Sequence, residues 1–196
     1  MPEITASLVK ELRDKTNAAM MKCKEALKEA DGDLEKAEMI LRKKGLKAAD
    51  KKASRSAKDG VIASYIHHDK VGVLIEVNCE TDFVAKTDVF RDFVKDVTLH
   101  IAAAQPTCVS RDQVPAELVE KEKEIFADQV KGKPENVVEK ILEGKLDKYY
   151  STICLLEQGF IKDPDQTVGD MLKSKIAELG ENIVIRRFTR YALGEE

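Results

Sequence analysis

The sequence of 196 residues contains no tryptophan, only 5% aromatic residues and four cysteines. No uninterrupted apolar run reaches the about 18 residues of a membrane-spanning helix, and charged residues from Glu3 onward interrupt the N-terminus before a signal-peptide core. The cysteines stand far apart without a CxxC pair, which excludes the closely paired motifs of zinc and dithiol sites. We therefore expect a cytoplasmic protein with reduced thiols and no membrane partner.

The common sequence motifs of catalysis are also missing. The chain has no phosphate-binding GxxxxGK[ST] loop, no dinucleotide-binding GxGxxG turn, no GxSxG elbow and no HExxH helix. Its histidines are His67, His68 and His100. The first two are neighbours on a predicted strand and should point to opposite faces, while His100 lies at the edge of an apolar helical stripe and should be packed or half-buried. We expect no covalent chemistry, no metal and no cofactor of the chain's own.

The charges do not favour nucleic acid as a partner. Lys and Arg number 33 and Asp and Glu 36, which gives a net charge of -3, so the overall field does not attract a phosphate backbone. Three arginines cluster near the C-terminus: Arg186 and Arg190 share one face of a predicted strand, and Arg187 takes the other. They suit phosphate contacts or ion pairs with the acidic helices, and we favour the ion pairs.

Residues 1–46 are predicted to form three short amphipathic helices. Thr5 and Asp33 are suitable N-caps, Asp31-Gly32 ends the second helix, and Gly45 marks the end of the third. Residues 47–59 then change to small and charged side chains without a large apolar residue, which favours a linker or a solvated helix. The sequence thus predicts a three-helix module, a linker and a following core.

Residues 60–196 are predicted to form an α+β core. Three segments read as strands of a small antiparallel sheet: Val61–His68, Lys70–Asn78 and Ile183–Tyr191. Helical periodicity marks a long helix up to Pro106, a helix from Pro115 closed by Gly132-Lys133-Pro134, a shorter helix ending at Gly144, and further helix from 145 to about 152. Thr167 and Asp170 form a capping box for Val168–Leu179, which Gly180 terminates. Strands and helices in separate runs indicate α+β rather than regular βαβ alternation.

Two short segments are the strongest candidates for contacts with a partner. Met20 and Met21 are neighbours on the second helix, about 100° apart, so if one enters the core the other is turned toward its edge or the surface, where methionine adapts to a partner. The alternative is that both pack in the small core. In the segment Thr81-Asp82-Phe83-Val84, which follows a strand, Thr81 or Asp82 can cap the next helix, and Phe83 is either a buried anchor or an exposed contact.

Three longer segments resemble the elongation factor Ts family, in the order that family shows. Leu12–Leu27 resembles its first signature, Glu76–Ala85 its second, and Gly180–Phe188 its typical ending. The resemblance covers essentially the whole chain. It implies that the N-terminal module is similar to a ubiquitin-associated domain, and that the chain is a short form with one copy of the core.

The resemblance also implies a function. Members of this family promote GDP release from elongation factor Tu, the GTPase that delivers aminoacyl-tRNA, by inserting an Asp-Phe pair near its magnesium and phosphate site. The matching partner-binding positions here are Thr81, Asp82, Phe83 and Val84 in the core and Arg13, Met20 and Met21 in the module. Tyr65-Ile66-His67 resembles a Tyr-x-His pattern of longer members, which makes His67 a further partner contact. GDP, GTP and Mg²⁺ belong to the partner.

The short length implies an assembly as well. Longer members have two core copies, so two short chains are expected to form a homodimer and a 2:2 complex with elongation factor Tu. Two alternatives belong to other classes. A helical scaffold or adaptor without exchange activity would need only residues 1–46, and an RNA-associated protein would need a basic face that the charge balance does not show.

Overall fold

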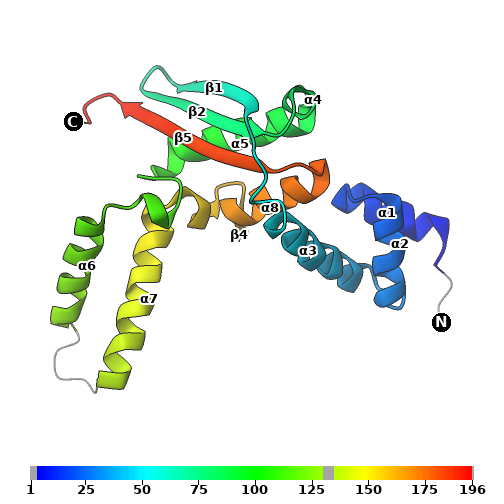
Figure 1. The fold of residues 1–196 in the computed structure, drawn as a ribbon, viewed down its shortest axis with the longest axis horizontal. Helices are drawn as coiled ribbons and strands as arrows, with labels where there is room; N and C mark the ends of the chain where they lie inside the picture. The colour runs from blue at the N-terminus through cyan, green and yellow to red at the C-terminus, as the bar shows by residue number, and fades with distance from the viewer. Residues whose placement is uncertain (1–3, 130–134, 196) are drawn as a thin grey trace. The chain divides into compact units, whose positions relative to one another are not determined.

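A computed structural model describes residues 4–129 and 135–195 of the chain (Figure 1). Its main elements are α1 Ala6–Thr16, α2 Met20–Glu29, α3 Leu34–Asp50, β1 Asp59–His67, β2 Val71–Cys79, α4 Asp82–Ala85, α5 Asp88–Ala104, α6 Ala116–Gln129, α7 Glu135–Ile153, β3 Gly159–Phe160, β4 Asp163–Thr167, α8 Val168–Leu179 and β5 Ile183–Ala192. The predicted α+β class with a small antiparallel sheet is confirmed. The predicted closure of α6 at Gly132-Lys133-Pro134 lies outside the described residues.

Contacts divide the chain into two compact units. The first comprises residues up to Gly60 together with Asn78–Arg91 and Leu172–Val184, and the second comprises Val61–Val77, Asp92–Met171 and the residues from Ile185 onward. This grouping differs from the predicted sequential division at 46 and 59, because segments distant in sequence join the N-terminal region in the first unit. Each unit is described below by itself.

Helices α1, α2 and α3 of the first unit pack around a small apolar core (Figure 1). The residues buried there are Val9, Leu12, Cys23, Ala26, Leu27, Ala30 and Ala37. The predicted caps are confirmed: Thr5 Oγ1 accepts a hydrogen bond from the Leu8 N–H, and Asp33 accepts one from the Lys36 N–H.

The predicted end of the third helix at Gly45 is wrong, because α3 continues to Asp50. A Cβ on Gly45 would lie only 3.2 Å from the Cβ of Ala177 in α8, so this glycine permits a close approach of two helices within the first unit. Ala49 is buried, and Asp50 pairs with Lys173 at 2.9 Å. The beginning of the predicted linker is therefore an anchored helical turn.

The principal sheet has the strand order β1-β2-β5. A two-residue turn joins β1 to β2: His68 and Asp69 both have positive φ, at 48° and 57°, and the Lys70 N–H donates to the His67 carbonyl. Positive φ at both central residues is the type I′ geometry that suits the twist of a β-hairpin. Along β2, Val73, Ile75, Val77 and Cys79 are buried, whereas Leu74 is exposed on the other face.

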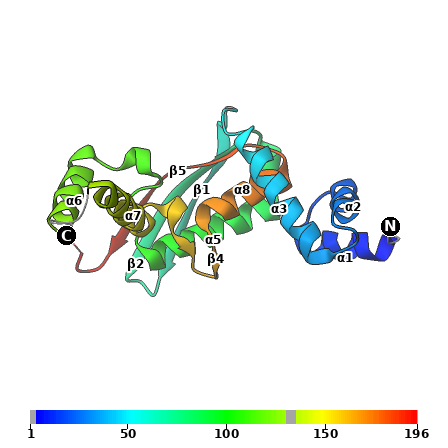
Figure 2. The same ribbon diagram turned by 90° about the horizontal axis from the view of Figure 1, so that it is seen from below.

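The second unit contains a long helical hairpin of α6 and α7, which lie side by side (Figures 1 and 2). The predicted break at Gly144 is wrong, because α7 runs without interruption to Ile153. A Cβ on Gly144 would meet nothing within 4 Å, so this glycine is an exposed helical position rather than a terminator. Its unfavourable helix propensity of about 1 kcal/mol is offset by its neighbours in a long helix.

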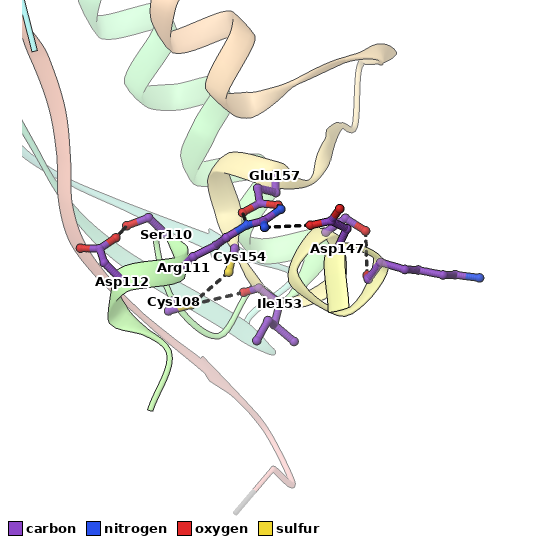
Figure 3. Close-up of polar contacts among 10 residues, drawn as sticks. Cys108, Ser110, Arg111, Asp112, Asp147, Ile153, Cys154 and Glu157 are labelled. Atoms are coloured by element: carbon purple, nitrogen blue, oxygen red, sulfur yellow. Dashed lines mark hydrogen bonds and ion pairs between the residues drawn. The ribbon is translucent and has the colours of Figure 1, made fainter. Parts of the chain in front are cut away.

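The base of α7 is tied to the short turn that follows α5 (Figure 3). Arg111 donates to the carboxylates of Glu157 and Asp147, and its guanidinium lies 4.5 Å above the Tyr150 ring. Beside this cluster the Cys108 and Cys154 sulfur atoms lie 3.6 Å apart. These contacts order residues 153–161, a segment whose sequence pattern is ambiguous, into a 3₁₀ turn and the short strand β3.

His100 is fully buried in the second unit. Its Nε2 lies 3.0 Å from Gln158 Oε1, and its Nδ1 accepts a hydrogen bond from the Ile161 N–H. Burial lowers the pKa of this histidine, so it is neutral, with Nε2 as its donor nitrogen. The expectation of a packed histidine is confirmed, and the side chain is fully buried. Within residues 4–129 and 135–195, no helix is long and apolar enough to cross a membrane.

Candidate functional site

Phe83 is the most exposed large apolar side chain among the described residues, with 79% of its surface accessible. It lies on α4, a single helical turn that directly follows β2. The Thr81 hydroxyl caps this turn by accepting a hydrogen bond from the Val84 N–H at 3.4 Å. Val84 is half-buried and Ala85 is buried, so one side of the turn packs inward while Phe83 faces solvent. The interpretation of Phe83 as a buried anchor is wrong.

Of the two possible caps, the structure selects Thr81 and gives Asp82 a different contact. The Asp82 carboxylate pairs with the ammonium of Lys86 at 2.5 Å, four residues further along. The hydrogen bond from Lys86 lowers the pKa of Asp82, which keeps the carboxylate ionised. Asp82 therefore presents a charged but locally paired group beside Phe83.

The loop before α4 is held by a residue that the sequence did not single out. The Glu181 carboxylate accepts hydrogen bonds from the Glu80 N–H at 3.1 Å, the Thr81 N–H at 3.0 Å and the Thr81 hydroxyl at 2.7 Å. Glu181 stands about 100 residues away in the chain. Its position after Gly180 gave no local signal, because only the placement of β5 beside β2 brings it to this loop.

The carboxylate of Glu80, in turn, accepts a hydrogen bond from the loop that carries Glu181. Glu80 Oε1 accepts a hydrogen bond from the Asn182 N–H at 2.6 Å, and Arg55 lies 3.6 Å from the same oxygen. The buried Asn182 side chain donates to the carbonyls of Ala53 and Arg55. Below the loop, the Cys79 thiol donates to the Thr81 carbonyl, and burial raises the pKa of that thiol to about 11. The site thus combines the exposed ring of Phe83 with a preceding loop that many hydrogen bonds hold in place.

In the N-terminal helices, both methionines of the predicted pair are exposed. Met20 is 54% and Met21 67% accessible, while Cys23 and Leu27 fill the core, so the alternative that both methionines pack in the core is wrong. Met20 begins α2, where the first turn lies beyond the buried stripe. Arg13 is exposed on α1. Met39 on α3 is also exposed, at 56%.

His67 lies at the end of β1, in the second unit, whereas the other candidate residues lie in the first. Its Nδ1 is 2.8 Å from the Tyr65 hydroxyl. The expectation that His67 and His68 point to opposite faces is wrong: their ring centroids are 4.2 Å apart, because His68 has already left the strand for the left-handed turn. In the part of the chain that the structure describes, no group of three or more His, Cys, Asp or Glu residues is arranged to hold a metal ion.

Two of the three arginines near the C-terminus, Arg187 and Arg190, form ion pairs with residues that are not on helices. Arg187 pairs with Glu76 on β2 at 2.7 Å, and Arg190 pairs with Glu195 while donating to the Ala102 carbonyl of α5. Arg186 is exposed. The preference for ion pairs is confirmed for Arg187 and Arg190, but their partners are not on helices: Arg187 reaches Glu76 because β5 lies next to β2, and Arg190 pairs with a residue five positions further along the chain.

Comparison with known proteins gives one consistent result. The family model described as "Elongation factor TS" matches residues 4–195. A protein of Alkaliphilus oremlandii named "Elongation factor Ts" is 60% identical over 195 residues, covering 98% of this chain and 90% of the relative. Proteins of the same name from Acetivibrio thermocellus and Thermodesulfovibrio yellowstonii are 60% and 54% identical, each over 98% of this chain and over 91% and 97% of their own lengths.

Proposed function

The chain belongs to the elongation factor Ts family, and from this premise we propose that it is a guanine-nucleotide exchange factor for elongation factor Tu in translation elongation. In this proposal it binds the GDP-loaded GTPase and promotes GDP release by inserting Asp82 and Phe83 near the partner's magnesium and phosphate site. The exchange factor forms no covalent bond. It has no cofactor of its own, since GDP, GTP and Mg²⁺ are held by the partner.

The observation that carries the proposal is the exposure of Phe83. An aromatic side chain with 79% of its surface in water gains about 1.5 to 3 kcal/mol when it is fully buried. That free energy is realised only when a partner covers the ring. Thr81 and Val84 fix the turn from which Phe83 projects, and their contacts are internal to the chain. The segment therefore offers one large apolar group on a preorganised support, as interface hot spots do.

Exchange requires that the factor distinguish the empty GTPase from the loaded one. If the factor weakens GDP binding by a given free energy, GDP must weaken the factor's binding by the same amount. An exposed ion pair, worth about 0 to 1 kcal/mol, does not supply such a coupling alone. A buried aromatic group together with the contacts of the N-terminal helices supplies more of this coupling free energy. Met20 and Met21 are the apolar contacts there and Arg13 the charged one.

The experiment is a measurement of GDP release. Purified elongation factor Tu loaded with fluorescent GDP is mixed with the chain, and the release rate is followed against factor concentration with excess unlabelled nucleotide. The proposal predicts a rate that rises with factor concentration and saturates. Ile161, 47% exposed and distant in sequence from the candidate segments, provides a control variant, Ile161→Ala, that should exchange like the parent. Binding of elongation factor Tu without accelerated release would favour the adaptor alternative instead.

We further propose that the chain forms a homodimer through the open face of its sheet. Ile62 and Ile66 of β1 and Leu74 of β2 are exposed. Ile66 and Leu74 share this face, because the Ile66 side chain covers Gly72, two residues before Leu74. Glu76 lies on the same face as Leu74, two residues away on β2, and its partner Arg187 on β5 therefore faces the same side. Tyr191 is four residues after Arg187 on β5, so its exposed side chain lies on this face too. An apolar face of this kind suits a second copy of the sheet, and the assembly with elongation factor Tu would be 2:2.

His67 is proposed as a weaker partner contact, since it is exposed at the turn of the β1-β2 hairpin and oriented by Tyr65. We propose a cytoplasmic location, where translation takes place. Neither nucleic acid nor a membrane is proposed as a direct partner, since the net charge is -3. The test for His67 is His67→Ala, which should weaken binding of elongation factor Tu less than Phe83→Ala does.

A further inference from the structure

We propose that Glu181 is a positioning residue for nucleotide exchange, which acts by fixing the loop that displays Phe83. The inference rests on the proposed function and adds to it a residue on another part of the chain. Glu181 lies in the turn between α8 and β5, and it is half-buried. Its hydrogen bonds go to Glu80 and Thr81, which precede Phe83 in the chain. Its effect on exchange passes through the backbone of Glu80 and Thr81.

The carboxylate of Glu181 is used on both oxygens. Oε2 accepts the N–H groups of Glu80 and Thr81, and Oε1 accepts the Thr81 hydroxyl. Because the hydroxyl proton points to Glu181, the oxygen of Thr81 directs a lone pair to the Val84 N–H and caps α4. One charged side chain thus orients the backbone before the turn and the cap of the turn. Hydrogen bonds to an ionised carboxylate are roughly twice as strong as neutral ones.

The contact is reciprocal, which makes the two loops a rigid pair. Glu80 accepts the Asn182 N–H while Glu181 accepts the Glu80 N–H, so each loop supplies a carboxylate to the backbone of the other. Asn182 is only 2% exposed, and its NH2 group donates to the carbonyls of Ala53 and Arg55. The loop of Glu181 is therefore itself held in place, and it provides a fixed reference for Thr81.

The position of Phe83 depends on this loop, because the exposed ring has few contacts of its own that could hold it in place. Its ring is mostly in water, and α4 has only four residues, too few for a helix to persist without tertiary contacts. If the loop were free, the aromatic ring would sample several positions and would lose this freedom on binding the GTPase. Preorganisation removes that entropic penalty before the encounter. Glu181 should therefore affect the maximal rate of GDP release more than the general stability of the fold.

The decisive experiment is a double-mutant cycle with the full chain. Glu181→Gln keeps the size of the side chain but removes its charge. Its single amide oxygen can accept from the two N–H groups or from the Thr81 hydroxyl but not from both, so an NH2 donor replaces one of the two acceptors. Glu178→Gln is the matched control, since Glu178 stands three residues earlier and pairs locally with Lys175. GDP release from elongation factor Tu is measured at saturating factor for the parent, for Glu181→Gln, Glu178→Gln and Phe83→Ala alone, and for Glu181→Gln combined with Phe83→Ala.

We expect Glu181→Gln to lower the maximal release rate about tenfold, which is the effect of about 1.4 kcal/mol. Glu178→Gln should leave it unchanged. In the Phe83→Ala background the Glu181→Gln effect should fall below about twofold, because there is no ring left to position. Equal effects in both backgrounds, or an unchanged rate in the single variant, would overturn the role of Glu181 while leaving the exchange function intact. If the parent does not accelerate release, the proposed function itself fails.

Two further measurements test the proposal even if Glu181→Gln fails to fold or is too unstable for the release assay. Thr81→Val removes the hydroxyl that binds Glu181 Oε1 and keeps the shape of the side chain. Like Glu181→Gln, it should lower the release rate, and it should have no further effect in the Phe83→Ala background. Hydrogen exchange of the Glu80 and Thr81 amides reports the contact directly. In the parent these amides should be protected, and in Glu181→Gln they should exchange at least tenfold faster while the buried strand β2 stays protected. Unchanged amide protection in that variant would contradict the proposal.

Discussion

Asp82 and Lys86 form an ion pair across one turn, and this pair places a fixed carboxylate next to the exposed ring of Phe83. Asp82 and Phe83, the two residues proposed to insert into the partner, therefore have different environments. Asp82 is bound to its own chain, with Lys86 lowering its pKa, whereas Phe83 gains its contacts only from a partner. This difference predicts unequal effects of their substitutions.

Phe83→Ala should leave the fold intact and slow GDP release from elongation factor Tu by at least about tenfold. The free protein loses few contacts, because the ring is exposed, so the melting temperature should stay within a few degrees of the parent; about 1 kcal/mol corresponds to about 2 to 4 °C at this chain length. The measurements are a thermal melt and the fluorescent GDP assay. A large drop in melting temperature would mean that the ring is buried in solution.

Asp82→Ala should slow GDP release by less than Phe83→Ala does. The substitution frees Lys86 and removes the carboxylate, but the cap of α4 is Thr81 and is retained. Lys86→Ala serves as its control, since it breaks the same ion pair and leaves Asp82 in place. If Asp82→Ala were the more severe change in the same assay, the carboxylate rather than the ring would carry the main contact.

Removal of residues 1–46 should leave a folded core that binds elongation factor Tu more weakly. The segment that follows contacts residues that the deletion keeps: Asp50, at the end of α3, pairs with Lys173, and the Asn182 amide donates to the carbonyls of Ala53 and Arg55. The sequence predicts no large apolar anchor in this stretch, and the contacts that hold it are polar. Circular dichroism and a binding titration test the prediction, and an unfolded truncated chain would contradict it.

A charge on the open face of the sheet should separate the proposed dimer. Leu74→Asp places a carboxylate where two apolar faces would meet, and the side chain is 49% exposed, so a single chain should tolerate it. Light scattering should give twice 21.9 kDa for the parent and 21.9 kDa for the variant at micromolar concentration. Ile161→Asp, which introduces the same charge at an exposed apolar position outside this face, should remain a dimer. A parent protein that is already monomeric would refute the dimer.

Local patterns were sufficient to predict much of the fold. Alternation along β2, the caps Thr5 and Asp33, and the cap that Thr167 gives to α8 are decided by residues within a few positions, and each is confirmed. Gly45 and Gly144 were misjudged as helix ends because a glycine's effect depends on what lies opposite it, which is Ala177 in one case and open space in the other. Glu181 was missed for the same reason, since its contacts are about 100 residues away.

Alkaline pH should destabilise the protein through its buried thiols, and Cys154 should contribute most. Cys154 is completely buried 3.6 Å from the Cys108 sulfur, and burial raises its pKa from 9.0 to about 12 (Figure 3). Between pH 9 and pH 12 the unfolded chain therefore releases a proton that the folded chain retains, so the free energy of unfolding falls as the pH rises. Urea unfolding at pH 8, 9, 10 and 11 should show this decline in the parent. In Cys154→Ala the decline should be smaller, whatever its stability at pH 8, because groups that titrate in both proteins cancel in the comparison. Parallel curves for the two proteins would show that the Cys154 thiol ionises as easily in the folded chain as in the unfolded one.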